Sequence, residues 1–269
     1  DRDIRRRLGM RLRGGDMLQP WFCADKEHPA MGRVRLRFSF DVETMPARLQ
    51  LAIEHPEKFS ITVNGHDDAL HAAAERWVDV CFTVMDVELS CCAAGRNVIE
   101  LTTDMREDIN LEALFLLGEF GVRLTGTHAV LTAMPEALMP GDIRGQGFPF
   151  YGAGITYYAE NLPADADTLE LASFEGAVIE LDGNGKNVPL FAPPYTADIA
   201  GLKENGCLSV TCILTRRNTF GPMHFAPITV EICEPDNFET EDERLLCRDG
   251  YTLIPQGLLE PPLVYASPK

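Results

Sequence analysis

The sequence predicts an all-β protein built from two tandem antiparallel β-sandwich domains that follow a short N-terminal connector. Apolar and polar residues alternate with a period of two along many short segments, as in strands that bury one face. Clusters of Gly, Pro, Asn and Asp separate these segments about every ten residues, a spacing typical of sandwiches and barrels. The order of segments in the first half also recurs in the second half, which indicates two copies of one kind of domain.

The segment 33–42, RVRLRFSFDV, is the clearest of the expected strands. Its Val, Leu and Phe residues share one face, and its arginines, Ser39 and Asp41 share the other. The same alternation recurs in the segments 48–55, 59–65, 78–89 and 97–103. Only two short stretches, 68–77 and 163–172, have the composition of helices.

The internal repeat predicts two turns and a domain boundary. In each half an apolar strand ends in Asn-Gly or Asp-Gly. We therefore expect the pairs Asn64-Gly65 and Asp182-Gly183 to form hairpin turns of type I′, which need positive φ at both central residues. We expect the boundary near Gly126. The predicted parts of the chain are the connector 1–32, the first sandwich 33–126 and the second sandwich 127–269.

The charge of the chain excludes some classes of partner. Its formal net charge is -17, from 24 Lys and Arg against 41 Asp and Glu. Such a charge repels nucleic acid and anionic membranes, and no apolar stretch is long enough for a membrane span. The N-terminal stretch is basic, but Ile4, Leu8 and Met10 interrupt it. This mixture favours a connector packed on an acidic neighbour over a nucleic-acid-binding arm, and the initial Asp suggests a piece of a longer protein.

The eight cysteines form no C-x-x-C pair, and most stand at apolar positions of expected strands. This pattern favours buried free thiols in a reducing compartment such as the cytoplasm, with a disulfide framework as the alternative. An extracellular location stays open if a longer parent chain carries a signal peptide.

Several short stretches suggest a known functional motif, but their residues do not have the types and spacing that the motif requires. The glycines of 141–154 lack the third glycine of a phosphate loop and lead into an expected strand. The stretch DGNGKNV begins like an EF-hand calcium loop, but Pro193 occupies the twelfth position, where a Glu is needed. The stretch 64–71, NGHDDALH, has two histidines and two aspartates but no third His or Cys to complete a metal site. We therefore expect a solvated loop there, and we assign no metal ligand and no catalytic residue.

Three segments resemble a known family when they are taken in order. They are LEALFLLGEFGVRL (111–124), QGFPFYGAGITYY (146–158) and the stretch 176–224, from GAVIELDG to TFGPMH. Together they resemble the C-terminal, non-catalytic region of large bacterial glycoside hydrolases with family 2-type sugar-binding jelly rolls, of which the rhamnosidase-like multidomain enzymes are the nearest. Two motifs stand out in this stretch: PPY-x-x-D, with Pro194, Tyr195 and Asp198, and N-x-x-GP-x-H, with Asn218, Gly221, Pro222 and His224.

The resemblance implies two galactose-binding-like jelly rolls that flank or support a preceding catalytic domain and have no chemistry of their own. It implies a carbohydrate as partner, besides that catalytic domain, while the net charge argues against nucleic acid and membrane. Arg216, Asn218 and His224 would hydrogen-bond sugar hydroxyls, while Phe150 or Tyr151 stacks on the apolar face of a sugar ring. No cofactor is expected, although the resemblance allows a structural calcium ion.

Other roles stay open beside this interpretation. Asn218 could instead bridge backbone groups of its loop, and His224 could contact the neighbouring domain. The chain could contribute catalytic carboxylates to a glycosidase, with Glu175 and Glu239 among the candidates, if two carboxyls lie about 5–10 Å apart in an open cleft. It could also be a structural interaction module, recognisable by an exposed apolar patch of several hundred Å².

Overall fold

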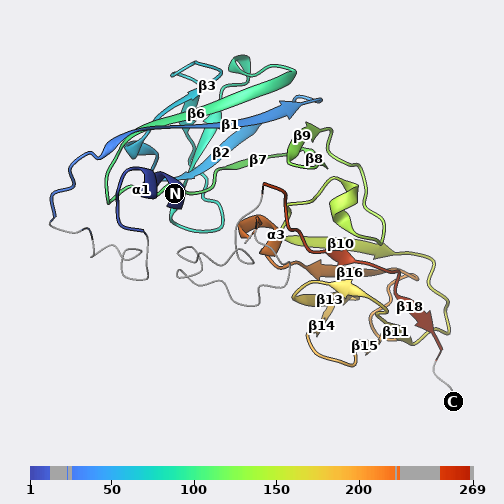
Figure 1. Ribbon diagram of the computed structural model, residues 1–269. Coiled ribbons are helices and arrows are strands. Elements are labelled where there is room, and N and C mark those ends of the chain that lie inside the picture. Colours follow the sequence, from blue (N-terminus) through green and yellow to red (C-terminus); the bar gives the residue numbers. More distant parts are fainter. Residues whose placement is uncertain (13–22, 24–25, 222, 225–248, 267–269) are drawn as a thin grey trace. The chain divides into compact units, whose positions relative to one another are not determined.

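The computed structural model of the protein describes residues 1–12, 23, 26–221, 223–224 and 249–266. These residues form two compact units, one from Asp1 to Met134 and the other from Pro135 onward. Strands make up nearly all of the regular structure in both units (Figure 1), so the predicted all-β class is confirmed. The division follows Met134, whereas the boundary expected near Gly126 falls in the turn between two paired strands.

The described residues of the first unit form one short helix, two single-turn 3₁₀ helices and a series of strands. The helical segments are α1 (Arg2–Arg7), η2 (Pro56–Lys58) and η3 (Leu89–Cys91). The strands are β1 (Gly32–Val42), β2 (Leu49–Glu54), β3 (Ser60–Val63), β4 (Leu70–Ala72), β5 (Phe82–Val87), β6 (Gly95–Met105), β7 (Phe115–Gly118), β8 (Gly121–Thr125) and β9 (His128–Thr132).

Two sheets of the first unit share one core, as in a sandwich. One sheet has the order β3-β6-β1-β9-β8 and the other the order β4-β5-β2-β7. Phe40 and Ile99 of the first sheet lie in the same buried cluster as Leu51 and Ile53 of the second. The pairings are antiparallel as predicted, except that β1 and β9 pair in parallel.

Strand β1 shows how the alternating sequence produces this arrangement. It pairs with β6 along its whole length, from Gly32 opposite Met105 to Val42 opposite Gly95. Its apolar residues are buried or half-buried, and its arginines are exposed. The predicted half-buried strand is therefore confirmed, because the period-two alternation matches the two faces of a sheet.

The basic N-terminal stretch packs on the first unit through the apolar residues that interrupt it. Ile4, Leu8 and Met10 join a small buried cluster with Val34 of β1. The side chain of Arg5 is fully buried, and its guanidinium donates a hydrogen bond to the carbonyl of Ile109 at 2.8 Å. The described part of the connector thus behaves as a packed segment, as its mixed composition predicts.

The described residues of the second unit form three smaller sheets. Its strands are β10 (Gly154–Ala159), β11 (Thr168–Glu170), β12 (Phe174–Glu175), β13 (Val178–Gly183), β14 (Lys186–Leu190), β15 (Thr196–Asp198), β16 (Leu208–Ile213), β17 (Gly257–Leu258) and β18 (Leu263–Tyr265). The helical segments are η4 (Ile143–Gln146) and α3 (Arg217–Phe220). The sheets have the orders β10-β16-β13-β14, β15-β11-β18 and β12-β17. One buried cluster joins all three, with Ile179 and Val210 from the first, Leu169 from the second and Leu258 from the third.

One of the two predicted hairpin turns is confirmed and the other lies two residues later. Asn64 and Gly65 have φ of 51° and 86°, as type I′ geometry requires. In the second unit Asn184 and Gly185 form the turn instead, while β13 continues to Gly183. A Cβ atom on Gly183 would lie 2.1 Å from the carbonyl oxygen of Leu202. Glycine is needed there for a close approach of two backbones.

The two stretches with helical composition are strands in part, so that expectation is wrong. Stretch 68–77 contains β4, which pairs with β5, and stretch 163–172 contains β11, which pairs with β15 and β18. Both stretches are too short to form a stable helix without tertiary support, and the neighbouring sheet edges offer backbone partners instead.

Candidate functional site

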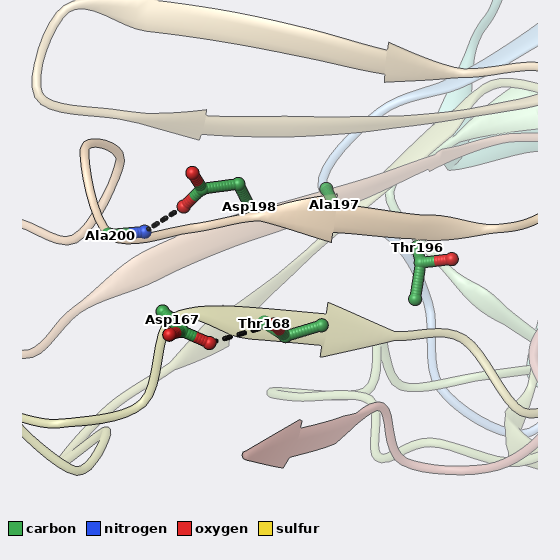
Figure 2. Close-up of a pocket in the computed structure, with 6 residues that line it drawn as sticks. All are labelled: Asp167, Thr168, Thr196, Ala197, Asp198 and Ala200. Atoms are coloured by element: carbon green, nitrogen blue, oxygen red, sulfur yellow. Dashed lines mark hydrogen bonds between the residues drawn. The ribbon is translucent and has the colours of Figure 1, made fainter. Parts of the chain in front are cut away.

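A polar pocket of about 400 Å³ lies in the second unit, where β11 and β15 run side by side (Figure 2). Its lining residues are Asp167, Thr168, Thr196, Ala197, Asp198 and Ala200. Thr168 stands opposite Asp198 in the antiparallel ladder, so the two strands bring two carboxylates and two hydroxyls to one place. Residues that lie far apart in the sequence thus share one pocket.

Asp198 reaches the pocket through the PPY-x-x-D segment. Tyr195 at the start of this segment packs against the core and makes an edge-on contact with Phe174, with ring centroids 4.8 Å apart. Ile199 is fully buried, whereas its neighbour Asp198 is exposed. The carboxylate of Asp198 accepts a hydrogen bond from the backbone N–H of Ala200 at 2.9 Å (Figure 2), which fixes the turn after β15. The motif therefore combines a core anchor with a pocket residue.

Asp167 forms the opposite wall and is held through its backbone. Its N–H donates to the carbonyl of Tyr265 at 3.1 Å, and its own carbonyl accepts from the N–H of Ile199 at 2.7 Å. The hydroxyl of Thr168 donates to the Asp167 carboxylate at 2.8 Å. The backbone of Asp167 is thus fixed by two other chain segments, and its carboxylate is bonded by the neighbouring Thr168.

Lys203 connects the two segments that flank the pocket. Its ammonium group donates hydrogen bonds to the carbonyl of Pro163 at 2.9 Å, to that of Ala164 at 3.1 Å and to that of Ala166. Lys203 belongs to the turn that follows Asp198, and the three carbonyls belong to the loop that precedes Asp167. The ammonium therefore holds both walls at a fixed separation.

The loop that the resemblance assigns to sugar binding lies beside the segment that contains Phe150 and Tyr151. The hydroxyl of Thr219 donates to the carbonyl of Phe150 at 2.8 Å. A Cβ atom on Gly152 would lie 2.4 Å from that hydroxyl and 3.2 Å from Cγ of Arg216. The structure thus brings Arg216 next to the aromatic segment, as a shared site would require.

Phe150 and His224 both contact Tyr251. The Phe150 and Tyr251 ring centroids are 5.1 Å apart, and those of His224 and Tyr251 are 4.9 Å apart. Nδ1 of His224 lies 3.2 Å from the carbonyl oxygen of Gly250, and burial raises the pKa of Tyr251. The sequence does not predict a role for Tyr251, because no local pattern around it indicates contact with Phe150 or His224.

Asn218 bonds backbone groups, as in the alternative considered for it, but those of Ile254 and not those of its own loop. Its side chain is fully buried. Its amide group donates to the carbonyl of Ile254 at 2.8 Å, and its amide oxygen accepts from the N–H of Ile254 at 3.0 Å. Because both ends of the amide are engaged and no part reaches the surface, we leave Asn218 out of the ligand-contacting set.

Two of the predicted contact residues present exposed side chains. Tyr151 is 38% exposed, and its hydroxyl donates to the carbonyl of Gly154 at 3.1 Å. Arg216 is exposed at the start of α3. These two residues are the most exposed of the predicted set, in which Phe150 and His224 are half-buried, and they offer one ring face and one guanidinium.

Of the two carboxylates named as catalytic candidates, the structure describes only Glu175. Glu175 is exposed on the two-residue strand β12, and Glu239 lies outside the described residues. The pair that shares a pocket is Asp167 and Asp198, which the sequence could not select among its many acids.

The stretch 64–71, expected to be a solvated loop, contributes to a cluster of metal-ligating types. His66 and Asp68 lie near Cys91, which comes from η3. No third ligand stands beside His66 and Asp68 in the sequence, and the fold brings Cys91 near them from a later segment.

The described cysteines are all free thiols: Cys23, Cys81, Cys91, Cys92, Cys207 and Cys212. Only Cys212 is buried, and burial raises its pKa to about 12. Cys81 and Cys207 are exposed, so the expected burial of the thiols holds for Cys212 alone among these six.

No helix among the described residues is long and apolar enough to cross a membrane.

Comparisons with known proteins yield little. No family model matches the chain, and no curated protein matches it. Among solved structures, the chain is similar to the α-L-rhamnosidase of Streptomyces avermitilis complexed with L-rhamnose, at 12% identity and a TM-score of 0.26, over 70% of this chain and 22% of that one. It is also similar to a rhamnosidase from a Novosphingobium species, at 14% identity and a TM-score of 0.27, over 87% of this chain and 21% of that one. The chain spans about a fifth of either protein, and likenesses of this size carry no argument about its function.

Proposed function

We propose that this chain is a non-catalytic, carbohydrate-binding region of a larger glycoside hydrolase. The observation that carries the proposal is that Asp198 lines a polar pocket together with Asp167 and two threonines. Asp198 belongs to one of the segments on which the family resemblance rests, and the pocket was not part of that resemblance. The sequence names Asp198 only as a member of this motif and assigns sugar contact to other residues, so its place in the pocket is what supports a binding role.

The composition of the pocket suits a sugar. Carboxylates accept hydrogen bonds and threonine hydroxyls both donate and accept them, so together they match the hydroxyl groups of a saccharide. The volume of about 400 Å³ lies within the usual range for small-ligand sites, roughly 300–1,000 Å³. The walls are held by backbone bonds and by Lys203, so the groups are positioned before a ligand arrives.

Tyr151 and Arg216 offer a second surface in the same unit for the same class of ligand. A tyrosine ring can stack on the apolar face of a sugar, and a guanidinium can donate to its hydroxyls. We rank this surface below the pocket, because Asn218 is buried and His224 is engaged with Tyr251 and Gly250.

Hydrolysis is the second candidate function, and the pair of carboxylates in the pocket is the observation that favours it. Glycosidases use two carboxyl groups that face each other across the scissile bond. We place it second because one oxygen of Asp198 fixes the turn at Ala200 and one oxygen of Asp167 accepts the Thr168 hydroxyl.

The test is a thermal-shift and calorimetric screen of the chain against rhamnose, galactose, glucuronic acid and their oligosaccharides, with and without calcium. A sugar that binds only the folded protein raises the unfolding midpoint in a saturable way. We expect Asp198→Asn and Thr196→Val to weaken binding about tenfold or more, since each removes hydrogen-bonding capacity for a sugar hydroxyl. Asn at position 198 can still accept from Ala200, so the turn is preserved.

Matched variants separate the two surfaces and the two functions. If Tyr151→Ala and Arg216→Ala weaken binding while Asp198→Asn does not, the sugar binds at the loop and the pocket assignment is wrong. A flat screen at millimolar sugar would reject carbohydrate binding and favour the structural interaction module. Release of nitrophenol from aryl glycosides by the chain, abolished in Asp167→Asn and Asp198→Asn, would establish hydrolysis instead.

A further inference from the structure

His66, Asp68 and Cys91 form a cluster on the first unit, separate from the pocket of the second unit. The ligand atoms that they offer, an imidazole nitrogen, a carboxylate oxygen and a thiol sulfur, all lie within 4.8 Å of one another. His66 and Asp68 are exposed, and Cys91 is half-buried. We propose that these three side chains bind a single zinc ion.

The turn that presents His66 is rigidly defined. His66 and Val63 exchange backbone hydrogen bonds at 2.9 and 3.0 Å across the Asn64-Gly65 turn. The position of His66 relative to the end of β3 is therefore set by the type I′ geometry. The imidazole can adjust by side-chain rotation from a fixed backbone.

The side chain of Asn64 ties this turn directly to the backbone of Cys91. Its amide group donates to the carbonyl of Cys91 and to the side-chain oxygen of Asn97, both at 2.8 Å. Its amide oxygen accepts from the N–H of Val98 at 2.9 Å. Asn97 is fully buried and also bonds the loop that follows Cys91, through the N–H and carbonyl of Ala93. This hydrogen-bond network thus fixes the turn that carries His66 relative to the backbone at Cys91.

A second set of hydrogen bonds joins the backbone beside Asp68 to η3. The N–H of Glu88 donates to the carbonyl of Ala69, the buried neighbour of Asp68, at 2.8 Å. The N–H of Cys91 donates to the carbonyl of Glu88 at 3.0 Å, and the Glu88 carboxylate accepts from the N–H of Ser90 at 3.3 Å. Both segments that supply ligands are therefore fixed to each other at two points. Such outer contacts are what orient the ligands of metal sites.

The donor set selects zinc over the hard cations. Zinc binds thiolate, imidazole and carboxylate at about 2.0–2.3 Å, which places tetrahedral neighbours roughly 3.3–3.8 Å apart. The cluster needs to close by only about 1 Å to reach this spacing, and exposed side chains can rotate that far at small cost. Calcium and magnesium prefer oxygen ligands only, so the thiolate disfavours them. Three protein ligands leave a fourth position for water.

Cobalt(II) is the probe that reports the proposed ligands, because a thiolate bound to it gives a charge-transfer band. We would titrate the chain with Co²⁺ under a non-thiol reductant and then displace the cobalt with Zn²⁺. We expect one equivalent to bind, with the thiolate band present, and Zn²⁺ to remove that band. Cys91→Ser should abolish the band and weaken Zn²⁺ binding about 100-fold, and His66→Ala should weaken it comparably.

Cys92→Ser and Asp67→Asn are the matched controls, since each removes a neighbouring group of the same type. Neither should change the band or the affinity more than about twofold. Asn64→Gly should weaken Zn²⁺ binding about tenfold, because it removes an orienting contact, keeps the positive φ of the turn and leaves all three ligands in place. Binding that survives Cys91→Ser, or that is lost equally in Cys92→Ser, would overturn the proposal, as would the lack of a saturable equivalent. The unfolding midpoint of each variant without metal checks that the first unit is intact.

Discussion

The two units contain Asn-Gly turns with nearly the same backbone, yet the chain continues differently after each. Asn64 and Gly65 have φ of 51° and 86°, and Asn184 and Gly185 have φ of 50° and 70°. After the first turn only Val63 and His66 pair, and the chain then passes to β4 in the other sheet. After the second turn β14 pairs with β13 from Lys186 to Leu190.

The residues that follow each turn explain the difference. His66, Asp67 and Asp68 are all polar and exposed, so they offer no apolar face to keep a second strand on the sheet. In β14, Val188 and Leu190 alternate with exposed residues and contribute to the core of the second unit. The Asn-Gly pair determines that the chain reverses, and the alternation after it determines whether a hairpin grows. Where the hairpin does not extend beyond the turn, the polar side chains that follow the turn are available to bind a ligand.

The largest effect that this comparison predicts concerns Asn97. Asn97→Ala removes hydrogen bonds to Asn64, Ala93 and Gly95 from a fully buried position, and should lower the free energy of unfolding of the first unit by about 3 kcal/mol. Asn187→Ala in the second hairpin removes one exposed bond to Asp182 and should cost about 0.5 kcal/mol. Urea unfolding of both variants measures the difference. Equal losses would show that the network around the first turn contributes no special stability.

Replacing the turn asparagines by glycine gives the next largest effect. Glycine keeps the positive φ, so only the side-chain bonds are lost. Asn64→Gly should cost about 1–2 kcal/mol, because three bonds to Cys91, Asn97 and Val98 disappear. Asn184→Gly should change stability by less than about 0.5 kcal/mol, since its amide makes a single long contact of 3.5 Å with Gly201. A larger loss for Asn184→Gly than for Asn64→Gly would contradict this view of the two turns.

The turn glycines should behave alike, which tests whether the two backbones are equivalent. A Cβ atom on Gly65 or on Gly185 meets no atom within 4 Å, so only the positive φ opposes a side chain. Gly65→Ala and Gly185→Ala should each cost about 1 kcal/mol. Thermal unfolding of the two variants provides the measurement. A difference above about 0.5 kcal/mol would show that the two turns differ in strain as well as in surroundings.

The smallest effect concerns thiol reactivity in the two units. Partial desolvation, followed by Asp79 and Glu54, raises the pKa of Cys81 to about 11, and burial raises that of Cys212 to about 12. At pH 8 iodoacetamide should modify Cys81 roughly tenfold more slowly than in the unfolded chain, and Cys212 only after unfolding.

Because folding raises both pKa values, the free energy of unfolding should fall as pH rises from the ordinary thiol range toward these values.

Mass spectrometry of the alkylated peptides follows both cysteines at once. Glu54→Gln should speed the modification of Cys81, because its thiol lies 3.7 Å from that carboxylate. Modification of Cys212 at the rate of Cys81 in the folded protein would show that the core around β16 opens more readily than its burial indicates.

The sequence predicts the strands well and the meeting of distant residues poorly. The alternation in β1 and the turn at Asn64-Gly65 follow from local rules, and both are confirmed. The internal repeat predicts the second turn at Asp182-Gly183, but DGNG contains a second eligible pair, and local rules do not choose between the two. The choice depends on β16, which pairs with β13 as far as Asp182.

The candidate sites depend even more on tertiary contacts. Asp198 could be singled out from its motif, but its neighbour Asp167 could not, because the two meet only through the register of β11 and β15. In the same way His66 is recognisable in the sequence as a ligand type, whereas Cys91 is brought near it by tertiary hydrogen bonds of Asn64 and Glu88. The buried place of Asn218 was beyond prediction, since its partner Ile254 lies on a returning segment.

The ammonium of Lys203 does not line the pocket, but it keeps the loop beside the pocket in place. Three carbonyl oxygens around one cation resemble the oxygen cage of a metal site, but the cation is covalently part of the chain. The walls therefore cannot be loosened by dilution or by a chelator. Acetylation of this lysine would remove the charge and release the loop. A ligand that enters the pocket would lose its own freedom without having to order the protein, so its binding entropy should reflect the ligand and its water alone.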